Sequence, residues 1–305
     1  MSVLSAPHFH EEVAAYEFVE AHVWPEGPVC PHCGGFERVG KMGGKSTRVG
    51  TYKCYQCRKP FTVKIGTIFE ASHVPMHKWL QAIFLICSSK KGISANQLHR
   101  TLGVTLKTAW FMGHRIREAM RAGDLPPMGE GGGFVEADET FIGRKKGVEK
   151  KGGGFGHKMK VMSLVERGRE VRSIVMDKVS RKTVEDVIRA NVHYEARLRT
   201  DTAQYYVKGG FGTADHKMVN HYLGEYVRGD AYTNTLEGYF SIFKRGMKGV
   251  YQHCAEKHLH RYMAEFDFRY NNRVARGVGD VERSSKVLLG IVGKRLTYRD
   301  SFASV

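Results

Sequence analysis

The stretch Thr233–Lys248, TNTLEGYFSIFKRGMK, has the hydrophobic spacing of a helix that lies on a core. At about 3.6 residues per turn its large apolar side chains form one stripe: Leu236, Phe240, Phe243 and Met247. The neighbouring stripe is polar and charged: Glu237, Ser241, Lys244 and Lys248. A carboxylate and lysines beside the core, rather than opposite it, indicate that something polar lies next to this helix.

The same stretch also has a simpler interpretation. Asn234 followed three residues later by Glu237 fits a capping box at a helix start, and the lysines would then be solvated. The rest of the chain has to decide between a cap and a chemical site.

The composition favours a polyanionic partner. The 305 residues include 48 Lys and Arg against 31 Asp and Glu, a formal net charge of +17, which indicates nucleic acid. No run of 18 apolar residues occurs, so we expect no membrane association. Residues 1–18 contain early acids and no continuous apolar segment, so we expect no signal peptide and a cytoplasmic protein.

Four of the six cysteines form two close pairs. Cys30-Pro-His-Cys33 and Cys54-Tyr-Gln-Cys57 are separated by twenty residues, and the segment between them is rich in Gly turns. Two such pairs supply the four thiolates of a tetrahedral site, so we expect one structural Zn²⁺. A redox role is the alternative for either pair alone. Residues 1–65 are therefore predicted to form an N-terminal helix, over 10–24, and a zinc ribbon.

Residues 66–125 have a helical pattern and are predicted to form a helix-turn-helix domain. Helices are expected over 76–88, 94–101 and 105–120, with Ser94 and Thr105 as caps and Gly103 in the turn. Four polar or basic side chains of the last helix are candidates for contact with DNA: Lys107, Thr108, Arg115 and Arg117. An ordinary helical hairpin that only packs is the alternative.

After a Gly- and Pro-rich linker, residues 126–290 are predicted to form an α/β domain, followed by a tail over 291–305. Strands are expected over 134–142, 158–165, 171–177 and 196–200, and helices over 183–192 and 255–270. Three strands, a helix and a further strand follow each other as in a ribonuclease H-like fold. The basic, Gly-rich segment 143–157 suits a phosphate backbone or is simply a flexible loop.

Three acidic residues occur in order along this domain. Asp138 lies within the first strand, Asp201 ends a later strand, and Glu237 begins the helix described above. Thirty-five residues separate Asp201 from Glu237, and six separate Glu237 from Lys244.

With these spacings and the zinc ribbon upstream, the chain resembles the DDE transposases of bacterial insertion sequences, over about residues 10–275. The resemblance is carried by the following motifs: CPHC, CYQC, VEADETFIG, RTDTAQYY, YVRGDAYTNTLEGYFSIFKRGMKGVY and HLHRYMAEFDFRYNNR.

The resemblance implies a transposase that binds the terminal inverted repeats of its element and cleaves and joins double-stranded DNA. Asp138 would bridge two Mg²⁺ or Mn²⁺ ions, with Asp201 and Glu237 each completing one. Water would attack first, and the 3′-hydroxyl released would then attack target DNA. Lys244 would hold the transposon end, and pairing two ends implies a homodimer or larger assembly.

Some assignments within these motifs have competitors. Glu136 shares the strand face of Asp138 while Glu139 points the other way, and Asp138 is chosen because it matches the family's position. Asn234 competes with Glu237; since an amide is a weaker Mg²⁺ ligand, Asn234 is expected to be a cap or a neighbour of the site.

Three further basic residues are expected to add to the DNA-facing charge: Arg245, Lys248 and Arg261. Simple solvation of these side chains is the alternative. The main alternative function is a DNA-binding regulator whose transposase-derived domain is inactive. A nuclease without strand transfer is a third and narrower possibility.

Overall fold

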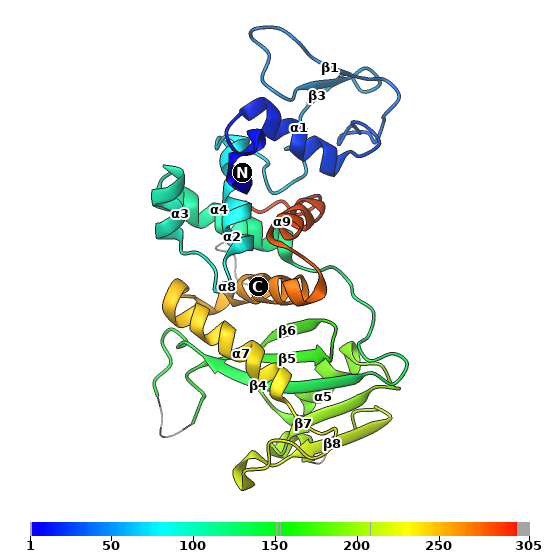
Figure 1. The fold of residues 1–305 in the computed structure, drawn as a ribbon, viewed down its shortest axis with the longest axis vertical. Helices are drawn as coiled ribbons and strands as arrows, with labels where there is room; N and C mark the ends of the chain where they lie inside the picture. The colour runs from blue at the N-terminus through cyan, green and yellow to red at the C-terminus, as the bar shows by residue number, and fades with distance from the viewer. Residues whose placement is uncertain (1, 151, 153, 208, 298–305) are drawn as a thin grey trace. The chain divides into compact units, whose positions relative to one another are not determined.

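The computed structural model describes residues 2–150, 152, 154–207 and 209–297 (Figure 1). The chain divides into two compact units: unit 1, Met1–Arg121 with Asn272–Val305, and unit 2, Ala122–Asn271. Within the described ranges, no helix has both the length and the apolar character needed to cross a bilayer.

Among its described residues, unit 1 combines a small three-stranded sheet with five α-helices. The strands pair antiparallel in the order β1-β2-β3: β1 (Val39–Lys41), β2 (Tyr52–Cys54) and β3 (Pro60–Phe61). The α-helices are α1 (Glu12–Val23), α2 (Met76–Ser88), α3 (Ala95–Leu102), α4 (Leu106–Met120) and α9 (Asp280–Leu289). Short 3-10 turns complete the unit: η1 (Val3–Ser5), η2 (Pro7–Phe9) and η5 (Val274–Arg276).

The helix α9 was not expected from the sequence, which assigned residues 126–290 to the catalytic domain. In the structure α9 is part of unit 1 because it buries Val287 and Leu288, and Arg283 donates to the carbonyl of Cys87 in α2 at 2.8 Å. The four predicted segments, 1–65, 66–125, 126–290 and 291–305, otherwise stay a prediction about domain organisation.

Unit 2 is built on a five-stranded mixed sheet in the order β6-β5-β4-β7-β8. The strands are β4 (Phe134–Ile142), β5 (Met159–Glu166), β6 (Val171–Met176), β7 (Arg197–Asp201) and β8 (Asp215–Val219). β4, β7 and β8 are parallel, and β5 is antiparallel to both β4 and β6. The expected α/β domain is therefore present, with one strand more than the sequence predicted.

The helical elements of unit 2 cover both faces of this sheet. They are α5 (Arg181–Asn191), α6 (Gln204–Val207), α7 (Asn234–Gly246) and α8 (Glu256–Asn271), with the 3-10 turn η3 (His221–Leu223) and the π turn η4 (Met247–Tyr251). α7 and α8 lie on one face and α5 on the other (Figure 1), each with its own apolar core. Side chains along β5 alternate between the two faces of the sheet and so contribute to both cores. Val161 and Val165 face α7 and α8, while Met162 and Leu164 face α5.

The apolar stripe predicted for residues 233–248 is confirmed. Its four members are at most 5 % exposed: Leu236, Phe240, Phe243 and Met247. The α-helix itself begins at Asn234 and ends at Gly246, where the π turn takes over. Burial of this stripe fixes which side of α7 faces the sheet, and so fixes where Glu237 points.

Candidate functional site

The four paired cysteines converge in unit 1. Their sulfur atoms all lie within 4.8 Å of one another, with Cys30 Sγ 3.6 Å from Cys57 Sγ and Cys33 Sγ 3.7 Å from Cys54 Sγ. A tetrahedral site with Zn–S bonds of about 2.3 Å requires S···S separations of about 3.8 Å. The donor set and its spacing therefore fit zinc.

Within the cluster the pKa values of two cysteines shift in opposite directions: burial and the neighbouring thiols raise that of Cys33 to about 12, whereas that of Cys54 is lowered. The N–H of Cys57 donates to Cys54 Sγ at 3.5 Å, and this backbone hydrogen bond is the main reason that the pKa of Cys54 falls to about 7. Trp24 packs edge-on against Tyr52 and Phe61, the few large side chains of the module. So small a core cannot hold the ribbon alone, which makes metal binding part of its folding.

Three acidic residues of unit 2 are brought to one region of the sheet by its parallel pairing. Glu136 of β4 is in register with Arg199 of β7, and Asp138 and Asp201 each lie two residues further along those strands. Glu237 lies in the first turn of α7, on the sheet face to which Asp138 points. The sequence prediction that Glu139 points to the opposite face is confirmed, since it accepts from Tyr205 Oη at 2.6 Å on the α6 side.

Burial and the neighbouring acids both affect the carboxyl group of Asp138. Its pKa is raised well above the ordinary value, first by burial and then by the charges of Glu139, Asp201 and Glu237. Among the described residues, neither Asp138 nor Asp201 forms an ion pair with a lysine or arginine. The carboxylates of Asp138 and Asp201 are thus not compensated by a lysine or arginine of the described residues.

The oxygens of the three acids are not packed as tightly as the four sulfurs. In the part of the chain that the structure describes, only the cysteine group brings three or more ligand atoms within 4.8 Å of one another. One oxygen of Asp201 accepts the N–H of Ala203 at 2.9 Å, and one oxygen of Glu237 lies 3.4 Å from His221 Nδ1. The arrangement is wider than a single-ion site.

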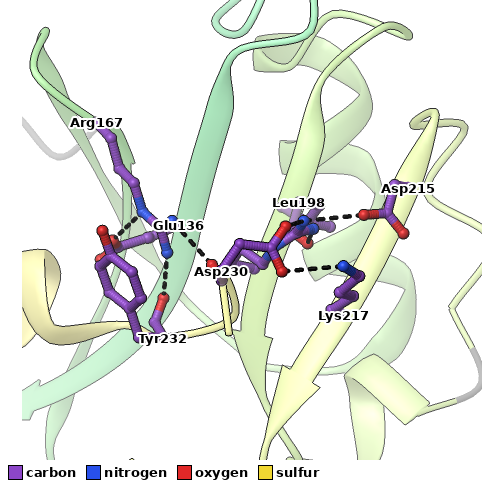
Figure 2. A network of polar contacts seen from close by, with 8 residues as sticks. Glu136, Arg167, Leu198, Asp215, Lys217, Asp230 and Tyr232 are labelled. Atoms are coloured by element: carbon purple, nitrogen blue, oxygen red, sulfur yellow. Dashed lines mark hydrogen bonds and ion pairs between the residues drawn. The ribbon is translucent and has the colours of Figure 1, made fainter. Parts of the chain in front are cut away.

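A buried carboxylate fixes the start of α7 (Figure 2). Glu136, 0 % exposed, accepts hydrogen bonds from the backbone N–H of Thr235 at 3.1 Å and of Leu236 at 3.2 Å. It also accepts from Thr235 Oγ1 at 2.8 Å and from Arg167 Nε at 2.7 Å. Negative charge at a helix N-terminus is favourable, and here it comes from the strand that carries Asp138.

The cap predicted for Asn234 is wrong. Asn234 is exposed and is the first residue of α7, while Thr233, the residue before it, makes no side-chain capping bond. The N–H groups that a local side chain would have capped are already taken by Glu136, about 100 residues away in the chain. Sequence inspection considered Glu136 only as a competing metal ligand and missed this role.

The segment that leads into α7 is held by two arginines (Figure 2). Arg167 donates to the carbonyls of Asp230 and Tyr232, each at 2.9 Å, and its guanidinium stacks 3.4 Å from the ring centre of Tyr232. The carboxylate of Asp230 binds Lys217 at 2.9 Å and the buried Arg199 at 2.5 Å, and the bond from Lys217, followed by that from Arg199, lowers the pKa of Asp230 to about 2. No local pattern marks these residues, because their partners are distant in the sequence.

The basic residues on and after α7 differ in how they are held. Lys244 is half-buried, with Nζ 5.9 Å from the ring centre of Phe240, and Lys248 is exposed in the π turn. Arg245 folds back along the helix, donating to the carbonyl of Ser241 at 3.1 Å and to its hydroxyl at 3.0 Å. Lys244 and Lys248 thus continue the face that begins at Glu237.

In unit 1 the predicted helical pair α3–α4 is present. Ser94 Oγ accepts the N–H of Gln97 at 3.1 Å, and Thr105 Oγ1 accepts the N–H of Thr108 at 3.1 Å. Gly103 adopts φ of +60° between the helices, a conformation that glycine favours. Lys107 is exposed in the first turn of α4, and Thr108 is half-buried beside it.

The predictions that Arg115, Arg117 and Arg261 face DNA are contradicted by the burial of all three side chains. The Arg115 guanidinium donates to the carbonyls of Leu296 at 3.0 Å, Ile68 at 2.8 Å and Glu70 at 2.9 Å. These are loop carbonyls that would otherwise be buried without a partner, so Arg115 has a structural role. Its basic character alone could not reveal this from the sequence.

Comparison with known proteins gives matches over both units. Residues 10–60 match a transposase zinc-ribbon domain, and residues 131–271 match an ISXO2-like transposase domain. The chain is also similar to an uncharacterized protein in the transposable element ISH50 of Halobacterium salinarum. The two are 29% identical over 264 residues, which span 81% of this chain and 86% of the other.

The cysteine cluster leads to a test of metal content. We expect about one zinc per chain, measured by atomic emission, and its loss in Cys54→Ser, because three thiolates leave the tetrahedral set incomplete. Cys254→Ser, outside the cluster, is the control and should keep its zinc. Full zinc content in Cys54→Ser would contradict the assignment.

The Glu136–Arg167 pair leads to a test of stability. Arg167→Ala leaves the fully buried Glu136 charge without its cation, so we expect a loss of about 3–5 kcal/mol in the free energy of unfolding. Arg181→Ala removes a pair with Glu185 at the surface of α5, in which the arginine side chain is 53 % exposed, and should cost less than about 1 kcal/mol. Equal losses in urea denaturation would show that the buried pair does not hold α7.

Proposed function

Because the chain belongs to the insertion-sequence DDE transposases with an N-terminal zinc ribbon, we propose that it cleaves and joins DNA at the ends of its own element. The observation that supports this proposal is the parallel register of β4 and β7, which sets Asp138 and Asp201 at corresponding positions, with Glu237 in the first turn of α7. Such an uncompensated set of carboxylates is what divalent-cation chemistry on a phosphodiester requires.

The sheet supports a ribonuclease H-like assignment for unit 2. The order β6-β5-β4-β7-β8, with an antiparallel β4–β5–β6 meander joined to parallel β7 and β8, goes beyond the four strands expected from the sequence. In this arrangement the central strand supplies Asp138 and its parallel neighbour supplies Asp201. A helix returning across the same face supplies Glu237.

The donor set fits hard divalent cations. Carboxylate oxygens are the ligands that Mg²⁺ and Mn²⁺ prefer, and phosphodiester chemistry commonly uses two such ions about 3.5–4 Å apart. When bound, such ions would activate the attacking oxygen and stabilise the leaving oxygen. Asp138, flanked by the other two acids, would hold both, while Asp201 and Glu237 would each hold one.

The other proposed site residues are basic or polar side chains that would bind DNA. Lys244 would hold a phosphate of the transposon end beside Glu237, with Arg245 and Lys248 extending the basic face along α7. Lys107 and Thr108, at the start of α4, would contact DNA as part of a helix-turn-helix, and the described part of 143–157 exposes further cations such as Arg144 and Lys146. Joining two ends would need a homodimer or larger assembly, acting on double-stranded DNA in the cytoplasm.

The catalytic assignment is tested by two neighbouring substitutions. We expect Glu237→Gln to lower Mg²⁺-dependent cleavage of DNA carrying the element's ends at least about 100-fold, since it removes a metal ligand. Asn234→Ala, also exposed in the first turn of α7, should retain most activity because Glu136 supplies the cap. The reverse order of activities would contradict the assignment, and a gel shift with no cleavage by the wild type would favour a regulator.

The binding assignment predicts a strong dependence on salt. We expect Lys107→Ala to weaken DNA binding and to reduce the slope of log K against log salt by about one, the loss of one phosphate contact. Lys286→Ala, whose side chain pairs with Glu282 on α9, is the matched control and should leave the slope unchanged. If the slope of log K against log salt were unchanged in Lys107→Ala, Lys107 would not contact a DNA phosphate.

A further inference from the structure

The connection between β8 and α7 exposes an unusual amount of apolar surface. Four large side chains within residues 220–229 point to solvent: Tyr222 at 98 % exposure, Leu223 at 81 %, Tyr226 at 56 % and Val227 at 55 %. Single exposed apolar residues are common in proteins, whereas four within six positions form a patch that indicates a partner. We refer to residues 220–229 as the apolar loop.

Hydrogen bonds within the apolar loop hold its backbone in a defined conformation. Asn220 Oδ1 accepts the N–H of Tyr222 at 3.0 Å, and the N–H of Asn220 donates to Glu225 Oε2 at 3.1 Å. Gly224 closes the 3-10 turn with φ of +73° and donates its N–H to the carbonyl of His221 at 3.1 Å. These bonds hold the backbone of the tip while Tyr222 and Leu223 stay outside.

The base of the loop is also closed. Arg228 and Ala231 exchange backbone hydrogen bonds of 2.9 and 3.0 Å, and Lys217 of β8 binds Asp230 at 2.9 Å (Figure 2). Asp230 is in turn held by Arg199. The contacts of Asp230 with Lys217 and Arg199, which fix the segment before α7, therefore also attach the base of the loop to the sheet.

The loop lies directly beside the proposed catalytic centre. His221 Nδ1 is 3.4 Å from Glu237 Oε1, and the His221 ring is 5.2 Å from the ring of Tyr226. A scissile phosphate held at Glu237 has its neighbouring nucleotides only one base step away, about 3.4 Å along a strand. The bases flanking the reacting phosphate would therefore meet this loop.

We propose that the apolar loop places Tyr222 and Leu223 against bases next to the scissile phosphate and holds the terminal base pair open. The inference rests on the proposed function. A paired duplex presents phosphates, sugars and polar base edges, whereas an unpaired base offers the flat apolar face that an exposed aromatic ring stacks on. Opening the pair would also free one strand at the cleavage position.

The first test measures base unpairing without cleavage. The full-length protein is bound, with Ca²⁺ in place of Mg²⁺, to duplex DNA of the element's end carrying 2-aminopurine at the terminal base pair. We expect the fluorescence to rise with the wild type and with Tyr222→Phe, which keeps the ring. The double variant Tyr222→Ala/Leu223→Ala should lose most of the rise, while Tyr194→Ala, a 67 % exposed tyrosine elsewhere in unit 2, should keep it.

The second test compares cleavage of a paired end with cleavage of an end already unpaired by mismatches. We expect the double variant to lose about 10-fold or more on the paired end and to recover on the mismatched end, since no pair remains to open. Equal loss on both ends would overturn the proposal, as would a drop of the double variant to a smaller assembly in sedimentation. The latter result would show that the loop binds a second copy of the chain.

The two tests separate this inference from the function on which it rests. If the wild type cuts neither substrate in Mg²⁺, the proposed function fails, and the fluorescence in Ca²⁺ still decides whether the loop opens a base pair. If the wild type cuts the paired end but gives no rise at the labelled base, the function stands and the role of the loop is overturned.

Discussion

The arrangement of unit 2 depends on one buried interaction, the bond between the carboxylate of Glu136 and the first turn of α7. Glu136 and Asp138 project from the same face of β4. This one strand therefore supplies a proposed metal ligand, Asp138, and the carboxylate that positions α7, the helix that carries the proposed ligand Glu237. The helix end favours the negative charge, and Arg167 compensates it, which allows a carboxylate to remain fully buried.

The need to fix the first turn of α7 also explains why the segment before it, around Asp230 and Tyr232, forms so many hydrogen bonds and ion pairs. Arg167 binds the carbonyls of Asp230 and Tyr232, and Arg199 and Lys217 bind the side chain of Asp230. A residue in the first turn of a helix is placed accurately only if the chain entering the helix cannot shift. Within the described part of the chain, Glu237 forms an ion pair with His221 alone. Its position is therefore set by this supporting network and by the apolar stripe beneath α7.

Sequence patterns correctly predicted the features that depend on interactions between residues close together in the chain. The apolar period of α7, the caps of α3 and α4, and the two cysteine pairs are each determined by residues a few positions apart, and the structure confirms them. The strand β8 was missed because Asp215–Val219 is short and polar. Glu136 as a cap and Arg115 as a structural residue were missed because their partners lie far along the chain.

The central claim is that Asp138, Asp201 and Glu237 together surround divalent cations. The most direct test replaces Mg²⁺ with Fe²⁺ and maps where the hydroxyl radicals produced at the bound metal cut the polypeptide. We expect cuts near all three residues, suppressed by excess Mg²⁺ and lost from all three positions in Asp138→Asn. Cuts that avoid one of the three segments, or that excess Mg²⁺ does not suppress, would contradict the claim.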